Sequence, residues 1–251
     1  MADPARNAAL FFTPDAYDPA GCGLNGRRMA GQSFLRGFVR NADVDAFVTV
    51  TNRSSEREQF AKIIAGESAP GKARPVRGVL MHNLRAMREI GTLYYPTPGL
   101  GHLLWARMAA GQTAYALCGI THTISTAPVM TQFFDLVTQP SEPWDAIICT
   151  SRAVKSAIEH QVGLALDYHA RRFGRRPEFR PMLPVLPLGI NCDDFQPAPT
   201  DGPALRKTLG IPAGDVVALV LSRMSMTEKF NPIPLYLALA EAAAQVPQCA
   251  I

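Results

Sequence analysis

The sequence predicts an α/β protein in which helices pack on a parallel β-sheet. Short apolar runs that are typical of strands alternate along the chain with longer segments of helical periodicity, and this alternation is the pattern of βαβ units. Hydrophobic residues make up 47% and charged residues 18% of the 251 residues, which indicates a folded core and excludes a disordered chain. The length is sufficient for about one to two domains.

The predicted strands are short, and several are rich in the β-branched residues that suit a pleated sheet. They are residues 8–12, 46–51, 79–81, 92–95, 115–120 and 146–149. Parallel strands need a crossover between them, and the intervening segments are long enough to supply one.

Helices are predicted between these strands. Ser54, Ser55 and Glu58 form a capping-box pattern that would start one helix, and Ser151 would cap the longest, which runs to about Arg172. The predicted helical segments are residues 31–40, 54–64, 100–110, 129–137 and 151–172. Residues 184–188 are expected to be extended.

A segment rich in Asp, Asn and Pro, residues 191–203, reads as a linker. We therefore predict an N-terminal Rossmann-like domain over residues 1–190, and a linker with the first βα unit of a second Rossmann-like domain over residues 191–251. The predicted elements of this second part are a helix at 204–209, a turn at 210–212, a strand at 216–221 and a helix at 232–245.

Charge and cysteine content give few constraints on partners. The formal net charge is +4, from 25 Lys and Arg against 21 Asp and Glu, which permits an anionic ligand or an anionic membrane surface. Neither a secretory signal nor a membrane-crossing run is recognisable. The cysteines form no CxxC pair and predict reduced, mostly buried thiols in a cytoplasmic protein. They are Cys22, Cys118, Cys149, Cys192 and Cys249.

The segment Gly21 to Gly26 matches the G-x-G-x-x-G pattern of dinucleotide-binding loops. That function needs the glycines directly between strand and helix, whereas Thr13 to Ala20 separate them from the first strand. The acidic residue expected after the second strand is also missing, although Arg53 there would suit a 2′-phosphate. The sequence favours a loop that faces a substrate phosphate or sugar, and a plain loop or an NAD(P)-dependent oxidoreductase remains an alternative.

Three other places in the sequence carry a family resemblance. Residues 26–35 (GRRMAGQSFL) are a glycine-containing helix start, and residues 119–125 (GITHTIS) place a histidine just past a strand. Residues 186–197 (LPLGINCDDFQP) are followed by 209–212 (LGIP) and by 222–229 (SRMSMTEK). Together these segments resemble the retaining family-four glycosyltransferases, whose GT-B fold consists of two Rossmann-like domains.

The resemblance implies a role for six residues. His122 would be the catalytic-site residue beside the sugar ring, and Gly26 and Arg27 would line the loop that faces donor phosphate or acceptor. Gly31, Arg223 and Lys229 would bind the donor. The cations suit the chemistry, because a departing nucleoside diphosphate gains negative charge that fixed positive groups stabilise.

The resemblance also implies the partners. A nucleotide-sugar and a glycan or small-molecule acceptor are expected, without nucleic acid, cofactor or metal. The acidic pairs nearest to an Asp-x-Asp metal motif, Asp43/Asp45 and Asp193/Asp194, lie in a predicted loop and in the linker. The basic segment Arg171 to Arg176 is interpreted as a solvated helix end, with peripheral contact to an anionic inner-membrane surface as the alternative.

The paired-glutamate segment that binds the donor in the resembling family does not occur in these residues. We therefore expect this chain alone to be inactive or nearly so. A non-catalytic α/β module that binds a sugar or a partner is the alternative function.

Overall fold

The computed structural model describes residues 8–18, 26–68, 74–196 and 201–245, apart from 213, 216, 218, 223–225 and 227–229. The chain divides into two compact units, Met1–Phe195 and Gln196–Ile251. The predicted domain boundary after residue 190 lies shortly before this division.

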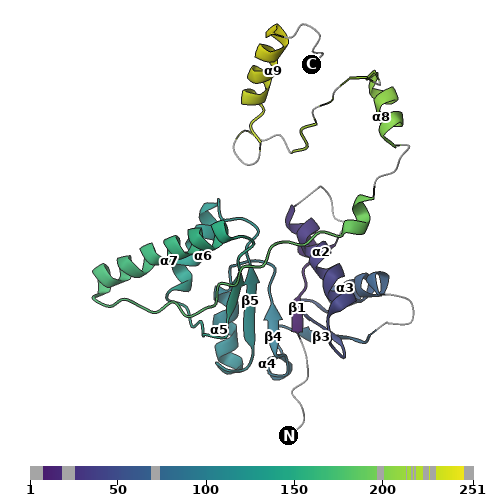
Figure 1. The fold of residues 1–251 in the computed structure, drawn as a ribbon. Coiled ribbons are helices and arrows are strands. Elements are labelled where there is room, and N and C mark those ends of the chain that lie inside the picture. Colours follow the sequence, from purple (N-terminus) through teal and green to yellow (C-terminus); the bar gives the residue numbers. More distant parts are fainter. Residues whose placement is uncertain are drawn as a thin grey trace. The chain divides into compact units, whose positions relative to one another are not determined.

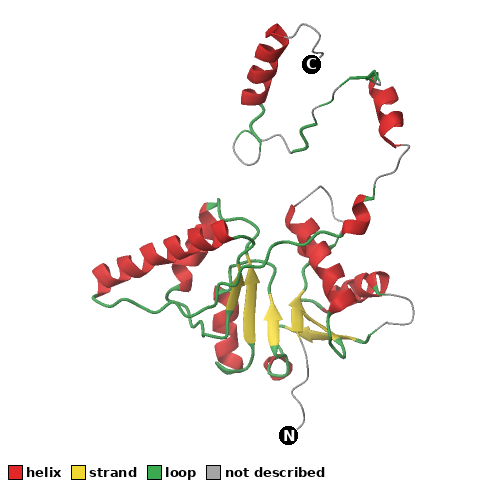
Figure 2. Ribbon diagram, viewed as in Figure 1, coloured by secondary structure: helices red, strands yellow, loops and turns green. Residues whose placement is uncertain are grey.

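The N-terminal unit is built on a parallel sheet of six strands in the order β3-β2-β1-β4-β5-β6 (Figures 1 and 2). The strands are β1 (Ala8–Phe11), β2 (Phe47–Thr51), β3 (Val76–Leu80), β4 (Thr92–Tyr94), β5 (Ala116–Ile120) and β6 (Ala146–Ile148). All neighbouring strands pair in parallel. This is the Rossmann strand order, so the predicted fold class is confirmed for this unit.

Helices connect the strands. They are α1 (Pro14–Tyr17), α2 (Gly26–Asn41), α3 (Ser54–Glu67), α4 (Leu84–Met87), α5 (Gly101–Ala110), α6 (Ala127–Leu136) and α7 (Arg152–Phe173), followed by the 3-10 helix η1 (Cys192–Phe195). Ser151 caps α7 as predicted, because its hydroxyl accepts a hydrogen bond from the Val154 amide at 3.1 Å.

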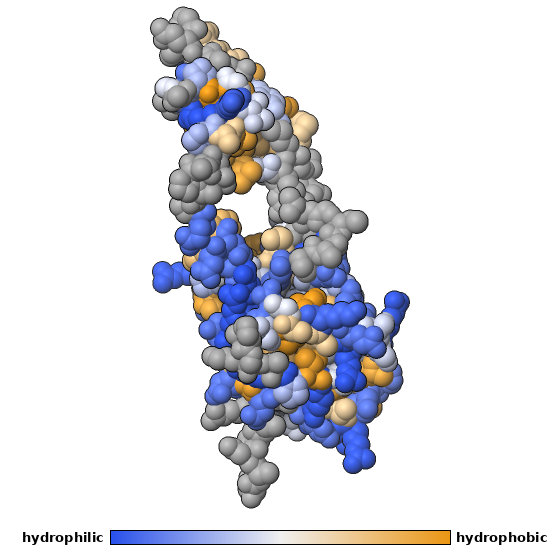
Figure 3. All heavy atoms as spheres, turned by 90° about the vertical axis from the view of Figure 1, so that its right-hand side faces the viewer, coloured by the Kyte–Doolittle hydropathy of each residue, from blue (hydrophilic) through white to orange (hydrophobic). Residues whose placement is uncertain are grey.

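The two faces of the sheet carry two separate hydrophobic cores. Ala9 and Phe11 of β1 lie in one core and Leu10 and Phe12 in the other, as the period-two alternation of a strand requires. The first core includes residues of α4–α7, and the second includes residues of α1–α3. With the apolar residues inside, the face drawn in Figure 3 is largely hydrophilic, with hydrophobic residues gathered in compact patches.

Local predictions differ from the structure around the first two crossovers. The helix predicted at 31–40 begins at Gly26, and the residues between β1 and the glycine pattern, for which no element is predicted, contain the short helix α1. The predicted capping box of α3 is also wrong. The Glu56 carboxylate, rather than Glu58, accepts hydrogen bonds from the Asn52 and Arg53 amides at 3.1 Å each, because Arg53 occupies the cap position and Glu56 stands three residues later.

In the second unit the predicted helices form and the predicted strand does not. The helices are α8 (Asp201–Leu209) and α9 (Ile233–Gln245), and Gly210, with φ of +67°, ends α8 in the left-handed conformation. The described residues 217 and 219–221 of the predicted strand at 216–221 have no strand structure. A strand needs a neighbour to pair with, and the described part of this unit contains no named strand.

One buried ion pair joins three elements of the N-terminal unit. The guanidinium of Arg107 in α5 contacts both carboxylate oxygens of Asp145, at 2.5 and 2.9 Å, and both side chains are 0% exposed. Asp145 also accepts hydrogen bonds from the amides of Leu117 in β5 and of Glu142. Arg107 donates to the carbonyls of Tyr115 and Pro140. The pair therefore links α5, the start of β5 and the turn before β6.

Asp145→Ala is expected to lower the free energy of unfolding by about 3–5 kcal/mol, because it leaves the Arg107 guanidinium buried without its counter-charge. Glu89→Ala is the matched control, since its ion pair with Arg77, at 3.3 Å, is exposed and contributes only about 0–1 kcal/mol. Denaturant unfolding of both variants measures the difference. Equal losses in the two variants would contradict the role given to the buried pair.

Candidate functional site

The carboxyl edge of the sheet has a natural ligand-binding position between β1 and β4. The order of the strands reverses there, because crossovers from β1 lead toward β3 on one side and from β4 toward β6 on the other. The loops at such a switch point diverge and leave a crevice.

His122 lies at this edge, two residues after the end of β5. Thr121 holds the end of β5 against β6: its hydroxyl donates to the Ile148 carbonyl at 3.0 Å and accepts from the Thr150 amide at 3.3 Å. Gly119 allows the loop after β4 to lie close, because a Cβ at this position would stand 2.8 Å from the Thr97 carbonyl oxygen. The backbone that carries His122 is thus fixed on both sides.

The imidazole of His122 is held in its neutral form. Burial, and then the positive charge of Arg27, lower its pKa below the usual value for histidine. Both ring nitrogens are buried and neither has a hydrogen-bond partner among the described residues. A neutral imidazole has one donor and one acceptor nitrogen, so this ring can bind a hydroxyl group of a ligand in either sense.

Arg27 lies in the first turn of α2 and directs its charge to the same edge. Besides lowering the pKa of His122, it counteracts the burial that raises the pKa values of Tyr17 and Tyr95. Its guanidinium lies 3.8 Å from the Asp15 carboxylate. The fold therefore brings together Arg27 and His122, which lie far apart in the sequence.

Packing of α1 against α2 requires a glycine at position 31. A Cβ at this position would lie 2.0 Å from the carbonyl oxygen of Ala16, so the glycine allows α1 to contact α2. Gly26, by contrast, is exposed at the start of α2, and a Cβ there would meet nothing within 4 Å. The donor-binding role of Gly31 and the loop role of Gly26 and Arg27 remain predictions.

A cavity of about 590 Å³ opens beside His122. It lies between α2, the carboxyl ends of β4, β5 and β6, and the segment after the last strand. Its lining residues are Ala30, Ser33, Phe34, Gly37, Phe38, Asn41, Tyr94, Ile120, His122, Ile148, Leu186, Pro187, Leu188 and Gly189. The volume is within the usual range for small-molecule sites, about 300–1,000 Å³.

Two tyrosines at the end of β4 belong to the site although the sequence analysis gave them no role. Tyr94 stacks on Phe34 of α2, with ring centroids 4.4 Å apart. Tyr95 packs edge-on against Phe11 and His102. Burial raises the pKa of both phenols, so both are neutral at physiological pH. Only the strand order could have identified them, because it places β4 next to β1.

Several predicted residues lie outside the described part of the chain, namely Arg223, Lys229, Cys22, Cys249 and the glycines at 21 and 23. Helix α1 stands between β1 and that glycine pattern, and a dinucleotide fingerprint does not have a helix there. Within the described residues no cluster of potential metal ligands occurs, and none of the helices is both long and apolar enough to cross a membrane.

The other described cysteines are ordinary thiols. Cys149 is buried and Cys118 partly buried, and burial raises the pKa of Cys118 to about 11. Cys192, in contrast, is exposed. The basic segment after α7 is partly neutralised, since Arg176 lies 3.2 Å from the Asp167 carboxylate.

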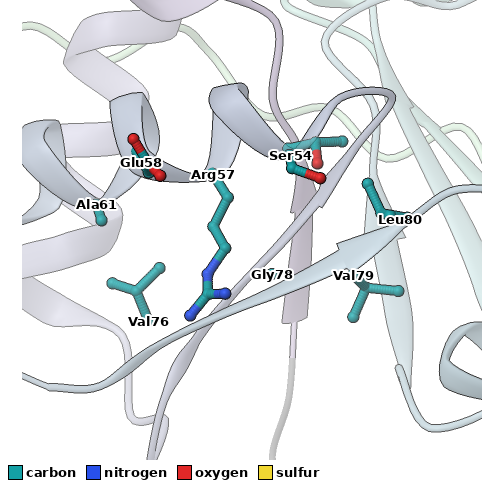
Figure 4. Close-up of a pocket in the computed structure, with 9 residues that line it drawn as sticks. Ser54, Arg57, Glu58, Ala61, Val76, Gly78, Val79 and Leu80 are labelled. Atoms are coloured by element: carbon teal, nitrogen blue, oxygen red, sulfur yellow. The ribbon is translucent and has the colours of Figure 1, made fainter.

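A second pocket, of about 500 Å³, lies at the β3 edge of the sheet and contains none of the predicted catalytic or ligand-binding residues (Figure 4). Arg57 of α3 extends over Gly78 of β3, where a Cβ would stand 2.5 Å from the arginine Cδ. Ser54 and Glu58 line the same pocket. Strands β2, β1 and β4 separate β3 from β5, the strand that leads to His122.

Comparisons with known proteins give a fold-level likeness only. No family model and no curated protein matches the chain. Solved structures of Anabaena HepE in complex with UDP and glucose, and with UDP, are similar at 15% identity, with TM-scores of 0.46 and 0.47. The alignments cover 81% of this chain, which spans about half the length of those structures (50% and 49%).

Gly31→Ala is expected to lower the free energy of unfolding by about 1–3 kcal/mol, because the added methyl group clashes with the backbone of α1. Gly37→Ala in the same helix is the control. Its Cβ would enter open space, so helix propensity alone acts and stabilises by about 0.5–1 kcal/mol. Urea unfolding distinguishes the two, and a Gly31→Ala variant as stable as Gly37→Ala would contradict the packing assignment.

Arg27→Gln is expected to raise the pKa of His122, because a repelling positive charge is removed, while the value stays below the usual one since the ring remains buried. NMR titration of the imidazole signals measures the shift. His102 is the internal reference: its pKa is lowered by burial alone, so it should not move. An unchanged or lowered His122 pKa would show that the two residues are not close.

Proposed function

We propose that this chain belongs to a glycosyltransferase that moves a sugar from a nucleotide-sugar to an acceptor hydroxyl, with retention of configuration. The observation that carries the proposal is the position of His122, whose ring nitrogens have no partner among the described residues, beside a cavity of about 590 Å³ at the carboxyl edge of a Rossmann-ordered sheet. The resemblance of residues 186–197 and 222–229 to the interdomain passage and diphosphate-binding segment of retaining glycosyltransferases supports the same reaction.

In this reaction the acceptor oxygen forms a bond to the anomeric carbon and the bond from that carbon to the diphosphate breaks. The diphosphate leaves with the electron pair, and the hydroxyl proton is released. Arg223 and Lys229 would stabilise the growing negative charge on the leaving group. His122 would bind a hydroxyl of the donor sugar with one ring nitrogen and hold the sugar ring in place, which leaves the other nitrogen for a second hydroxyl, since a neutral imidazole can donate one hydrogen bond and accept another.

Arg223→Ala, Lys229→Ala and His122→Ala are each expected to reduce turnover by at least about a hundredfold in the natural protein, without loss of folding. Release of UDP or GDP from a panel of nucleotide-sugars measures turnover, and calorimetry measures donor binding. His160→Ala is the control, because this histidine is exposed on α7. Unchanged turnover in the three variants would refute the proposed function. Nucleotide binding without any turnover would instead favour the non-catalytic binding module.

A further inference from the structure

The second face of the sheet is only partly covered by helices. Among the described residues, the helices that contribute to this core are α1, α2 and α3, whereas the core residues of α6 and α7 all lie on the opposite face. Tyr94, Ile120 and Ile148 therefore form an apolar floor at the carboxyl ends of β4, β5 and β6, and this floor lines the cavity beside His122.

Helix α2 forms one wall of this cavity, which we call the α2 groove. Its lining residues recur at helical spacing from Ala30 to Asn41, so they share one face of the helix and extend about 16 Å along it. They combine two aromatic rings, Phe34 and Phe38, with the small residues Ala30 and Gly37. A Cβ at Gly37 would meet nothing within 4 Å, so this position borders open space.

The chain after β6 forms the other wall. In Figure 1 it crosses the carboxyl edge of the sheet toward α2. One end is held by the Leu186 amide, which donates to the Cys149 carbonyl at 2.9 Å. The other end is held by Asp194, whose carboxylate oxygens lie 2.8 and 2.7 Å from the Arg36 guanidinium. The apolar side chains of Leu186 and Leu188 between these anchors are about half exposed (55% and 46%).

Two polar side chains of the groove, Ser33 and Asn41, are hydrogen-bonded within the protein, whereas His122 at one end can bind a ligand hydroxyl. The hydroxyl of Ser33 accepts a hydrogen bond from Asn191 at 3.2 Å, and the side-chain amide of Asn41 donates to the Gly37 carbonyl at 2.8 Å. The ring nitrogens of His122 have no partner in the described structure. The groove therefore matches a molecule with an apolar body and a hydroxyl group at one end.

We propose that the α2 groove binds the apolar aglycone of the sugar acceptor and presents the acceptor hydroxyl at His122. The proposal rests on the proposed function and names the acceptor class, an alcohol that carries a hydrocarbon group. Gly37 determines the room available for that group. The hydrocarbon can be alkyl or aryl, because both the aliphatic floor and the stacked aromatic rings are available to it.

The proposal is tested by calorimetry, which measures how tightly the 251-residue chain binds glycosides that share one head group and differ in the apolar group. Octyl and phenyl β-D-glucopyranoside, below the micellar concentration, represent the alkyl and aryl forms, and methyl β-D-glucopyranoside is the head-group control. We expect the octyl or the phenyl compound, or both, to bind at least about tenfold more tightly than the methyl compound. Equal affinity for all three would overturn the proposal.

Gly37→Leu should fill the groove and weaken binding of the tighter compound by at least about tenfold. Gly163→Leu is the matched control, because Gly163 is also helical and partly buried with open space at its Cβ, but lies on α7. Unweakened binding in a folded Gly37→Leu variant would overturn the proposal. Should this variant fail to fold, affinity of the unaltered chain must still rise with the size of the apolar group, either from methyl through hexyl to octyl glucoside or from methyl through phenyl to naphthyl glucoside, and flat affinity in both series overturns the proposal.

These measurements need no donor and no turnover. Tight binding of the octyl or phenyl compound that is lost in Gly37→Leu supports the apolar site. If the chain then binds no nucleotide-sugar, the transferase function is refuted and the apolar site is not. Nucleotide-sugar turnover with no preference for apolar acceptors would overturn the α2 groove assignment and leave the transferase function standing.

Discussion

The buried ion pair of Arg107 and Asp145 organises the half of the sheet that carries the candidate site. Removing both charges from water is costly, and the cost is offset because the pair is bidentate and both residues make further hydrogen bonds to backbone groups. Those partners come from β5, from the turn before β6 and from α5. The pair therefore fixes the positions of the first residues of β5 and β6. The carboxyl ends of these strands follow from that register, and they carry His122 and the start of the segment that borders the α2 groove.

Topology supplies the second constraint. With strands in the order β3-β2-β1-β4-β5-β6, the helices after β1 and β2 pack on one face, and those after β3 to β6 pack on the other. The face that carries α1–α3 is consequently thin above β5 and β6, where, among the described residues, the chain after residue 185 and the side of α2 cover it. A cavity with an apolar floor at the carboxyl edge is a direct result of this unequal cover. Its position coincides with the edge at which ligands bind in α/β proteins.

Burial and one neighbouring positive charge determine the protonation state of His122. The nearby charge identified by its effect on the ring is the guanidinium of Arg27, and no carboxylate within the described part of the chain contributes to the pKa of this histidine. Burial and like charge act in the same direction, so the ring is neutral. A ligand with a hydroxyl group, or with negative charge that pairs with Arg27, suits this environment better than a cation does.

Much of the local structure could be predicted from periodicity, because every named strand and most helices of the N-terminal unit lie within a few residues of their predicted positions. The misses have physical causes. Helix α1 is a single turn, too short to show a period, and the cap of α3 depended on the backbone of Arg53 rather than on a typical capping side chain. The strand expected at 216–221 was assigned from composition alone, and a strand exists only with a partner.

The sequence by itself determined the α/β class, the alternation of elements and the candidacy of Arg27 and His122, since these depend on local pattern and motif. Only the tertiary structure decided that the two residues meet, that Tyr94 and Tyr95 belong beside them, and that Gly31 serves the contact between α1 and α2. It also revealed the α2 groove. Strand order and helix packing bring together residues that are distant in the chain, and no local pattern encodes that long-range pairing.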